Sequence, residues 1–347
     1  MAATWTEMFP PSPTWTEADM KDQYGRVFLV TGGTAGIGYE TAKMIYHLNG
    51  TIYITSRSES SASKATEPIK SSSPHPSQTI PSGRGTISYV QLNLSDLSTI
   101  KGSAEEFLRR EKRLDVIIHN AGVMLPADPE EKTEQGYHLQ LGINVLAPFL
   151  LQHFLTPLLL STASLPDTRS FSTRVIWVSS SGHRASPVPD GVSWDDLDLL
   201  QASKTGLKKE VERYGQSKAM GVMLAYEFAR RYHEHGKGIL SFSLHPGALK
   251  TGLQDNLPRW FNAIFGWLRH DARMGALTEC WAGIREVNVE SGEGGMPGDG
   301  KVGKNGGYVV PWGRWGDGHE SVMKGLMERR TGERLWGVLE KMVGDYM

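Results

Sequence analysis

Short apolar runs rich in β-branched residues alternate with longer segments of helical pattern along most of this chain. The runs occupy residues 27–30, 52–54, 87–90, 116–118, 175–178 and 240–244. Such alternation is typical of βαβ units, and runs with few polar residues indicate strands that helices cover on both faces. The pattern therefore predicts an α/β protein with a single doubly wound parallel sheet and helices on both faces.

The 347 residues show no repeat and no linker that would divide two domains. We therefore expect one domain over 1–347, with an N-terminal arm over 1–24 and C-terminal helices over 316–347. The arm should pack on the domain through its aromatic side chains, which are Trp5, Phe9 and Trp15.

Two further segments have a distinct composition. Residues 57–85 are rich in Ser and Pro, which predicts a mobile surface insertion with a helix that is broken near Ser71. Residues 308–310 follow a Gly-rich stretch and predict a late edge strand.

The charges are balanced, with 37 Lys plus Arg against 38 Asp plus Glu. A net charge of -1 gives no reason to expect nucleic acid or an anionic membrane as a partner, and a small organic substrate fits better. The most apolar stretch, residues 144–160, is interrupted by polar residues and prolines, so we expect a buried helix and no membrane span.

The chain has one cysteine, Cys280, which excludes an internal disulfide and a cysteine-based zinc site. The first twenty residues carry acids and prolines where a signal peptide would need a basic start and an apolar core. Both features suit a reducing compartment, so we expect a cytoplasmic protein.

A glycine-rich run, Thr31-Gly32-Gly33-Thr34-Ala35-Gly36-Ile37-Gly38, lies between a predicted strand and a predicted helix over 39–48. Glycines let a backbone approach a pyrophosphate closely, and a helix N-terminus supplies unpaired N–H groups and partial positive charge. The run therefore favours dinucleotide binding over the alternative, a Gly-rich turn without a ligand.

Tyr214 and Lys218 lie four residues apart, which on a helix places a phenol and an ammonium on one face. A nearby positive charge should lower the pKa of the phenol and suit it to general acid or base catalysis. Ser180 follows a predicted strand, at the sheet edge where such folds bind ligands, and its hydroxyl would hold a substrate oxygen. A chance spacing on an ordinary helix is the alternative.

These motifs occur in an order that resembles the short-chain dehydrogenase/reductase family, a Rossmann-fold family. The resemblance rests on the glycine run, Asn120-Ala121-Gly122, Asn144, Ser180, Tyr214 with Lys218, and His245-Pro246-Gly247 followed by Thr251. Within that family, the Ser179 to His183 run and the long interval to Tyr214 look like the retinol-dehydrogenase-like branch. The arm and residues 306–314 look like its soluble fungal members, many of which act in specialised metabolism.

The resemblance implies a role for each motif residue. Tyr214 would donate or accept the proton, Lys218 would tune it and bind the nicotinamide ribose, and Asn144 would belong to a water-linked proton relay. The implied cofactor-binding set also contains Gly32, Thr34, Gly36, Ile37, Gly38, Arg57, Asn93, Leu94, Asn120, Ala121, Gly122, Pro246, Gly247 and Thr251. A histidine after the serine, His183, would either touch substrate or be structural.

Three positions inform the prediction of how the nucleotide binds and which nucleotide it is. Asn93 stands where the family usually has an Asp that contacts adenine, and its amide oxygen could still accept a hydrogen bond there. His119 replaces the first Asn of the family's Asn-Asn-Ala-Gly motif. After the second predicted strand there is no carboxylate for a ribose 2′-OH, whereas Arg57 could meet a 2′-phosphate, so we expect NADP(H). A plain solvated arginine is the alternative.

Residues 252–270 should cover the substrate, as the corresponding segment does in the family. Four aromatic side chains lie in nine residues here, and we assign substrate contact to Trp260, Phe261 and Phe265. A core helix or a dimer contact would also explain the segment.

The sequence thus predicts an NADP(H)-dependent oxidoreductase that interconverts a carbonyl and an alcohol on a hydrophobic, aromatic or polycyclic substrate, in the reducing direction. One alternative is a non-redox isomerase or cyclase, or a double-bond reductase, on the same scaffold. Another is a non-catalytic NADP(H)-binding module. The expected state is a monomer or a homodimer.

Overall fold

A computed structural model describes residues 2–200, 206–250, 269–287, 296 and 304–347 of the chain. Across these residues one eight-stranded sheet runs in the order β3-β2-β1-β4-β5-β6-β7-β8. Its strands are β1 (Val27–Val30), β2 (Thr51–Ser56), β3 (Thr86–Gln91), β4 (Val116–His119), β5 (Thr173–Val178), β6 (Ile239–Leu244), β7 (Tyr308–Val310) and β8 (Arg314–Gly316). Strands β1 to β7 pair in parallel, as the sequence predicted.

The prediction of an edge strand at 308–310 is half right. β7 forms there, but it lies between β6 and the short antiparallel β8, which is the edge. The sequence did not predict β8, because the three residues from Arg314 to Gly316 are too few to show an alternation of apolar and polar side chains.

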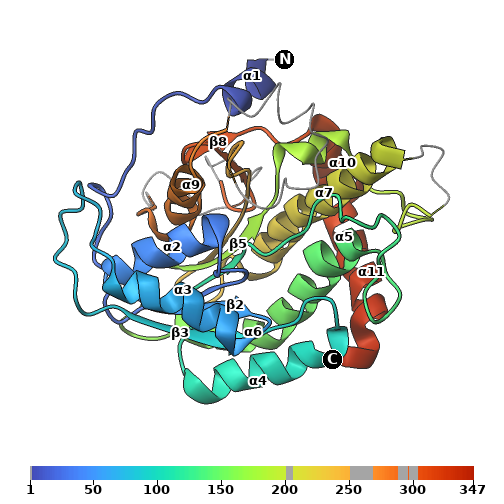
Figure 1. The fold of residues 1–347 in the computed structure, drawn as a ribbon. Helices are drawn as coiled ribbons and strands as arrows, with labels where there is room; N and C mark the ends of the chain where they lie inside the picture. Colours follow the sequence, from blue (N-terminus) through green and yellow to red (C-terminus); the bar gives the residue numbers. More distant parts are fainter. Residues whose placement is uncertain (1, 201–205, 251–268, 288–295, 297–303) are drawn as a thin grey trace.

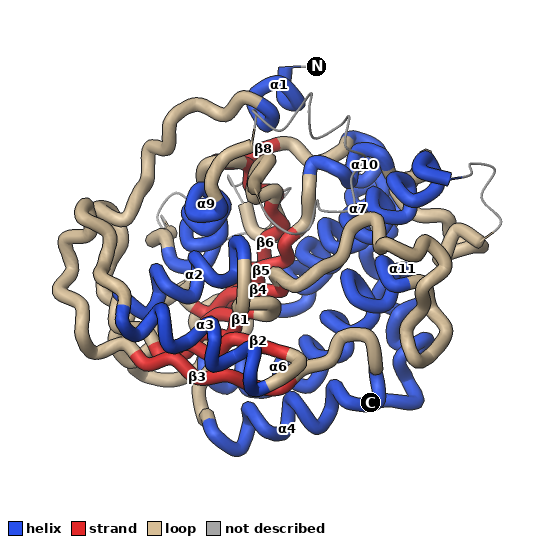
Figure 2. The backbone as a smooth tube through the Cα atoms, viewed as in Figure 1, coloured by secondary structure: helices blue, strands red, loops and turns tan. Residues whose placement is uncertain are grey.

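Helices cover both faces of the sheet (Figures 1 and 2). One face packs against α2 (Gly36–His47), α3 (Glu59–Ser71) and α9 (Ala272–Ile284). The other packs against α4 (Ile100–Arg110), α6 (Ala147–Ala163), α7 (Gly206–Tyr232), α10 (Glu320–Arg329) and α11 (Thr331–Val343). Strands β4 and β6 are buried at every position, and most of their residues are apolar.

Helix α6 continues from α5 (Leu139–Leu141) through a π-helical turn (Gly142–Leu146). Within the described residues, this one stretch, 139–163, is long and apolar enough to cross a membrane, and 56% of its apolar window is buried. Phe149, Leu155 and Leu159 belong to the core, and the Phe149 ring meets Trp336 of α11 edge to face. The stretch is therefore a core helix of this fold, as expected.

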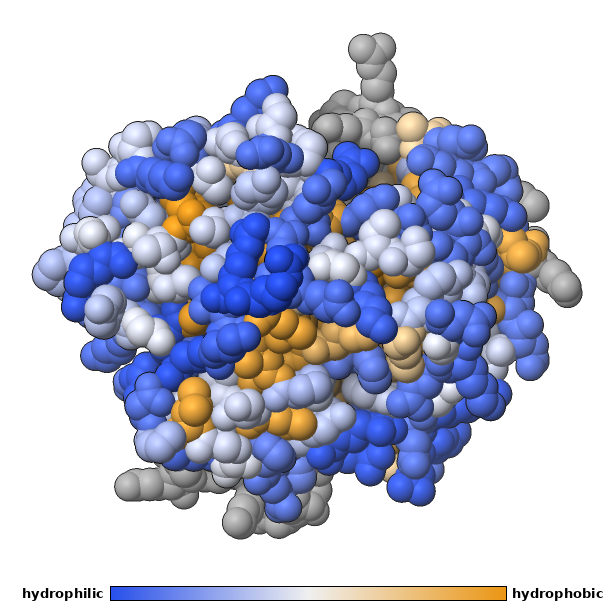
Figure 3. Space-filling view, turned by 90° about the horizontal axis from the view of Figure 1, so that it is seen from below, coloured by the Kyte–Doolittle hydropathy of each residue, from blue (hydrophilic) through white to orange (hydrophobic). Residues whose placement is uncertain are grey.

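The outer surface is mixed in character. The face in Figure 3 is mostly hydrophilic, with apolar side chains gathered near its centre. On α6, Phe154 and Leu158 are only partly buried although they pack against the core.

The N-terminal arm is held differently from the prediction. Trp5 and Phe9 of the segment around α1 (Ala2–Met8) contact each other with tilted rings, whose centres are 4.3 Å apart, yet the two side chains remain 64% and 37% exposed. The arm is anchored by Glu7, which is buried and forms an ion pair with Arg184 at 2.6 Å. Trp15 is partly buried against the core, as expected.

The surface segment after β2 contains a regular helix. Ser58 caps α3 by accepting a hydrogen bond from the Ser61 N–H, and the helix ends at Ser71, before the first Ser-Pro step. Most of the residues from 72 to 85 are exposed, which fits the predicted surface insertion.

A fully buried carboxyl group lies between α2 and α9. Glu279 accepts a hydrogen bond from the Thr41 hydroxyl at 2.6 Å through Oε2, while Oε1 has no hydrogen-bond partner among the described residues. Burial raises the pKa of Glu279 from 4.5 to about 8. The folded protein therefore keeps this group protonated at neutral pH.

We predict that Glu279 makes the fold less stable as pH rises. Its folded pKa lies above its unfolded value, so stability is full below about 4.5 and is lost as pH rises through about 8. Each pH unit between these values costs at most about 1.4 kcal/mol. Glu279→Gln should therefore flatten the pH dependence of the unfolding free energy between pH 7 and 8, measured by urea denaturation.

The exposed Glu105→Gln on α4 is the matched control, and it should leave that slope unchanged. A Glu279→Gln variant with the wild-type slope would show that the carboxyl group titrates normally.

Candidate active site

Most of the residues predicted to bind the cofactor follow parallel strands, so the fold brings them to one edge of the sheet. At this carboxyl edge the chain leaves β1 toward α2 and leaves β4 in the opposite direction, which is where open α/β sheets form a ligand crevice. The segments at this edge are Thr31 to Gly38, Arg57, Asn93 with Leu94, Asn120 to Gly122, Ser180, and Pro246 with Gly247.

The glycine run forms a tight loop into α2. Gly32 and Gly36 have φ of 67° and 58°, which favour glycine. A Cβ on Gly38 would lie 2.5 Å from Asn120 Nδ2 and 2.7 Å from the Gly32 carbonyl oxygen. Ala35, which precedes α2, makes no side-chain cap, so the first N–H groups of the helix can face an anion.

Asn120 and Ala121 tie this loop to the end of β4. Asn120 Nδ2 donates to the Thr31 carbonyl at 2.8 Å, and the Ala121 N–H donates to the Thr31 hydroxyl at 3.0 Å. Thr34 and Ile37 are partly exposed on the same loop. The residues present therefore fit the pyrophosphate part of a dinucleotide.

Arg57 and Asn93, which were predicted to contact the adenosine end of the nucleotide, lie in different environments. The Arg57 side chain is exposed, and within the described residues it makes no hydrogen bond or ion pair. The Asn93 amide oxygen already accepts hydrogen bonds from the Ser95 N–H at 3.2 Å and the Ser95 hydroxyl at 2.8 Å. Since both of its lone pairs are used, the amide oxygen suggested as an adenine acceptor is committed to Ser95.

Tyr214 and Ser180 face each other across α7 and the turn after β5. Tyr214 is 7% exposed, and its phenol lies next to the Ser180 hydroxyl. The Ser180 hydroxyl also accepts from the Gly182 N–H at 3.0 Å. The two hydroxyl groups can thus hold one oxygen atom of a ligand between them.

Lys218 lies one helical turn beyond Tyr214. Its Nζ donates to the Val178 carbonyl at 2.9 Å, and a Cβ on Gly122 would lie 3.2 Å from it. Burial lowers the pKa of Lys218 from 10.5 to about 8, so the ammonium predominates at neutral pH. Next to Gly122, this cation can reach a ligand that approaches from the end of β4.

The structure does not bear out the expected lowering of the Tyr214 pKa. Burial raises the pKa of Tyr214 above 10, and the hydrogen bond with Ser180 only partly opposes this effect. Lys218 Nζ lies 5.7 Å from the centre of the phenol ring and donates to a backbone carbonyl. Desolvation of the phenol therefore outweighs the nearby charge.

Asn144 sits on the π-helical turn before α6, a feature that is frequent at functional sites. Its Nδ2 donates to the Val123 carbonyl and to the Ser217 hydroxyl, each at 3.0 Å, while Oδ1 accepts from the Val123 N–H at 2.8 Å. Ser217 in turn donates to the Tyr214 carbonyl at 2.8 Å. The amide is thus fixed beside Tyr214 and Lys218.

Sequence reasoning missed two glycines that make the site possible. A Cβ on Gly182 would lie 2.8 Å from Tyr214 Cε1, and one on Gly215 would lie 2.9 Å from the Gly182 carbonyl oxygen. The turn and α7 therefore touch backbone to backbone. The Tyr-Gly and Ser-Gly pairs were visible in the sequence, but nothing there showed that they meet.

The segment after β6 is buried under a tryptophan. Gly247 has φ of 106°, and a Cβ there would lie 2.7 Å from the Trp312 ring. Pro246 is buried, and the Gly247 N–H donates to His245 Nδ1 at 3.4 Å. Thr251, the segment 252–268 and its Trp260, Phe261 and Phe265 lie outside the described residues, and so do their predicted contacts.

The two doubtful histidines are both structural. His119 is 4% exposed, stacks on Trp177 at 4.4 Å and meets Gln152 at 3.0 Å. Burial lowers its pKa to about 4. His183 is 0% exposed, so it has no surface to offer a substrate.

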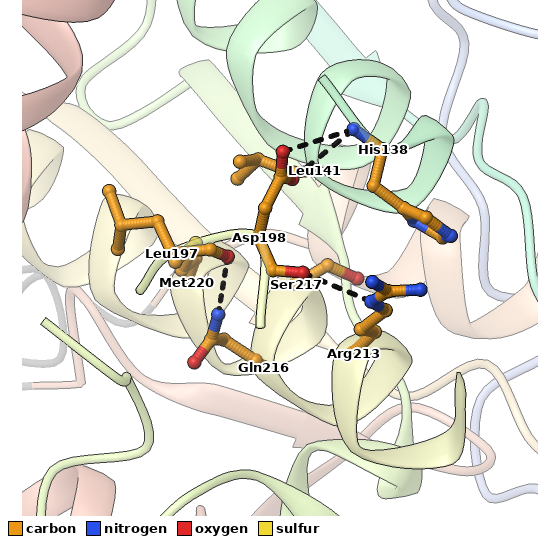
Figure 4. A pocket seen from close by; sticks show the side chains of 8 residues that line it. All are labelled: His138, Leu141, Leu197, Asp198, Arg213, Gln216, Ser217 and Met220. Carbon is orange, nitrogen blue, oxygen red and sulfur yellow. Dashed lines mark hydrogen bonds between the residues drawn. The ribbon is translucent and has the colours of Figure 1, made fainter. Parts of the chain in front are cut away.

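A small polar cavity of about 10 Å³ lies beside α7 (Figure 4). Asp198 accepts from the His138 N–H, and Gln216 donates to the Leu197 carbonyl at 2.7 Å. The other lining residues are Leu141, Arg213, Ser217 and Met220. The space suits one water molecule and is too small for an organic substrate.

Known proteins of similar sequence span the whole chain. A family model described as short chain dehydrogenase matches residues 26–188. The short-chain dehydrogenase/reductase pkfC of Emericella nidulans is 36% identical over 96% of this chain and 98% of its own length. A short-chain dehydrogenase/reductase of Phomopsis amygdali is 34% identical over 99% of this chain and 97% of its own.

Solved structures agree on the fold. An uncharacterized protein from Mycobacterium paratuberculosis superposes with a TM-score of 0.64 at 22% identity, covering 95% of this chain and 97% of its own. Pseudomonas aeruginosa RhlG, solved as an NADP active-site complex, has a TM-score of 0.53 at 21% identity, covering 73% and 87%. With the sequence relatives, the sheet order and the Ser180, Tyr214 and Lys218 arrangement in agreement, this chain belongs to the short-chain dehydrogenase/reductase family.

Proposed function

We propose that this protein is an NADP(H)-dependent reductase that converts a carbonyl group of a hydrophobic organic substrate into an alcohol. The observation that carries the proposal is that the Tyr214 phenol and the Ser180 hydroxyl both lie against Gly182, beside the buried Lys218 ammonium. This pair offers two hydroxyl donors to one substrate oxygen in a site of low polarity.

The chain's residues would divide the reaction as follows. Ser180 and Tyr214 hydrogen-bond the carbonyl oxygen and polarise it, as donors aimed at developing negative charge do. NADPH, when bound, supplies the hydride that the carbonyl carbon accepts and becomes NADP⁺. The Tyr214 proton passes to the oxygen, and Lys218 with Asn144 supports the return of a proton to the phenolate. Each turnover thus consumes one hydride and one proton.

The state of Tyr214 is compatible with the reducing direction. Burial raises the pKa of Tyr214, so the phenol is protonated at neutral pH and can donate its proton to a carbonyl oxygen. The same group can act in both directions, and we propose reduction because cells usually keep NADP in its reduced form.

Arg57 supports NADP(H) as the nucleotide. Its guanidinium is exposed after β2, and no carboxylate occupies residues 55–58 to take a ribose 2′-OH. The NADP complex of Pseudomonas aeruginosa RhlG, a protein of similar fold, agrees with this preference.

A bulky apolar substrate from specialised metabolism fits the relatives and the sequence. The relatives named above come from fungi. The aromatic segment around Trp260, Phe261 and Phe265 is proposed to cover such a substrate. A non-redox enzyme or a pure nucleotide-binding module are the competing possibilities, and a binding module would have no use for the Tyr214 and Ser180 pair.

We predict that Tyr214→Phe abolishes reduction while NADPH still binds. The change deletes one hydroxyl and leaves the glycine loop and Arg57 intact, and positioned general acid catalysis contributes about 10²- to 10⁴-fold. The measurement is NADPH oxidation against quinones, polycyclic ketones, steroids and retinal, with product identification, together with an NADPH dissociation constant. Near-native NADPH oxidation by Tyr214→Phe would remove the proton-transfer role from Tyr214. No NADPH oxidation by the wild type would favour the non-redox enzyme or the binding module, and product identification would separate these two.

We predict that Arg57→Ala weakens NADPH binding by roughly ten- to a hundredfold, since a charge-assisted hydrogen bond is worth about 1.5–3 kcal/mol. NADH, which lacks the 2′-phosphate, should bind as before. Titration calorimetry with both nucleotides measures this, and Arg109→Ala at an exposed site on α4 is the matched control. An equal loss for both nucleotides would remove Arg57 from the 2′-phosphate site.

A further inference from the structure

His183 lies three residues after Ser180, and both of its ring nitrogens are engaged. Nδ1 is 2.6 Å from the Ser180 carbonyl oxygen, and Nε2 is 2.8 Å from the backbone N of His319. The Tyr308 hydroxyl is a longer 3.4 Å from Nδ1, and the two rings are 4.8 Å apart. The imidazole therefore joins the catalytic turn, β7 and the residue before α10.

The partners fix the state of this imidazole. A carbonyl can only accept a hydrogen bond, so Nδ1 must carry the proton, whereas a backbone N–H can only donate, so Nε2 must carry a lone pair. The ring is consequently neutral and in one tautomer. Burial, with Arg184 and His319 nearby, lowers the pKa of His183 to about 4, which agrees with this assignment.

The same contacts shape the turn that carries the catalytic hydroxyl. The Ser180 carbonyl accepts from the His183 backbone N–H at 3.0 Å as well as from Nδ1. The Ser180 hydroxyl accepts from the Gly182 N–H at 3.0 Å, which leaves its own proton for Tyr214 or a substrate oxygen. The direction of that hydroxyl thus depends on the conformation of the turn.

Direct chemistry by His183 is excluded by its surroundings. The side chain is 0% exposed, and neither nitrogen is available for a substrate. Any effect on catalysis must pass through Ser180.

We propose that His183 is a positioning residue, which holds the Ser180 turn in its active shape by a bond from Nδ1 to the Ser180 carbonyl and is itself oriented by the His319 N–H. This inference rests on the reductase function proposed above. In this proposal His319, in the C-terminal segment, helps to orient the hydroxyl of Ser180, which lies 139 positions earlier in the chain.

The first test compares two replacements of His183. Leucine can form neither of the two hydrogen bonds of the imidazole, but it still fills the buried space with a side chain. The asparagine amide can still donate a hydrogen bond to the Ser180 carbonyl. We expect His183→Leu to lower kcat for phenanthrenequinone at least tenfold with the NADPH dissociation constant unchanged, and His183→Asn to recover most of the loss. The matched control is His47→Leu, another buried histidine with two hydrogen bonds, to Ser72 and Ser82, far from the site.

The second test asks whether His183 acts through Ser180. If it does, His183→Leu should cost little extra kcat in a Ser180→Ala background, because the group it positions is gone. An equal fold-loss in both backgrounds, or a wild-type kcat for His183→Leu alone, would overturn the proposal.

A third variant leaves His183 in place. His319 has φ of -59°, which proline adopts. Compared with His319→Ala, His319→Pro removes the N–H donor and directs its ring carbon Cδ at His183 Nε2, so this hydrogen bond cannot form and the imidazole must move. We expect kcat to fall severalfold further in the proline variant. If His183→Leu does not fold, this comparison tests the positioning role of His183 in its place. Equal kcat values for His319→Pro and His319→Ala would contradict the role of the His319 N–H.

A readout without turnover separates this proposal from the proposed function. Amide hydrogen exchange in residues 181–185 should speed up in His183→Leu and His319→Pro but not in His47→Leu. If the wild type reduces no carbonyl compound, the reductase function fails, while the exchange rates still test the positioning of the turn. Unchanged exchange there would overturn it.

Discussion

The backbone contact between α7 and the turn after β5 is the constraint on which the rest of the site depends. Gly182 and Gly215 leave no Cβ between the two segments, so the helix approaches the turn more closely than any side chain would allow. The turn carries Ser180 and the helix carries Tyr214, and their hydroxyls meet only at this separation. Lys218 then reaches the Val178 carbonyl at the end of the same strand.

Most of the framework could be predicted because it follows from local pattern. Apolar runs gave all six main strands, and the strand, glycine loop and helix order located the nucleotide crevice. Parallel pairing also brings Ser180 to the same edge as the glycine loop. Asn144, Tyr214 and Lys218 lie on helical segments, and their place beside Ser180 was implied by the family resemblance. The sequence relatives confirm the family that these motifs suggested.

What the sequence could not provide depends on contacts between distant residues. Glu7 and Arg184 form an ion pair across 177 positions. Nothing in the sequence distinguishes these two residues from charged residues that face solvent. The bond from the His319 N–H to His183 involves a backbone group, which leaves no trace in residue type. The pairing of β8 with β7 is likewise a consequence of packing that no sequence pattern encodes. The hydrogen bonds between Asn93 and Ser95 are different, because they join residues only two positions apart.

Burial also sets the protonation states of Tyr214 and Lys218, on which the proposed proton transfer depends. It raises the pKa of Tyr214 and lowers that of Lys218, so each group is pushed toward its neutral form. A phenolate beside an ammonium would be the state needed to accept a proton from an alcohol, whereas a neutral phenol is the state needed to donate one. At neutral pH the phenol stays protonated and Lys218 keeps its charge. The burial of the site, more than the charge of Lys218, therefore decides the protonation state of Tyr214.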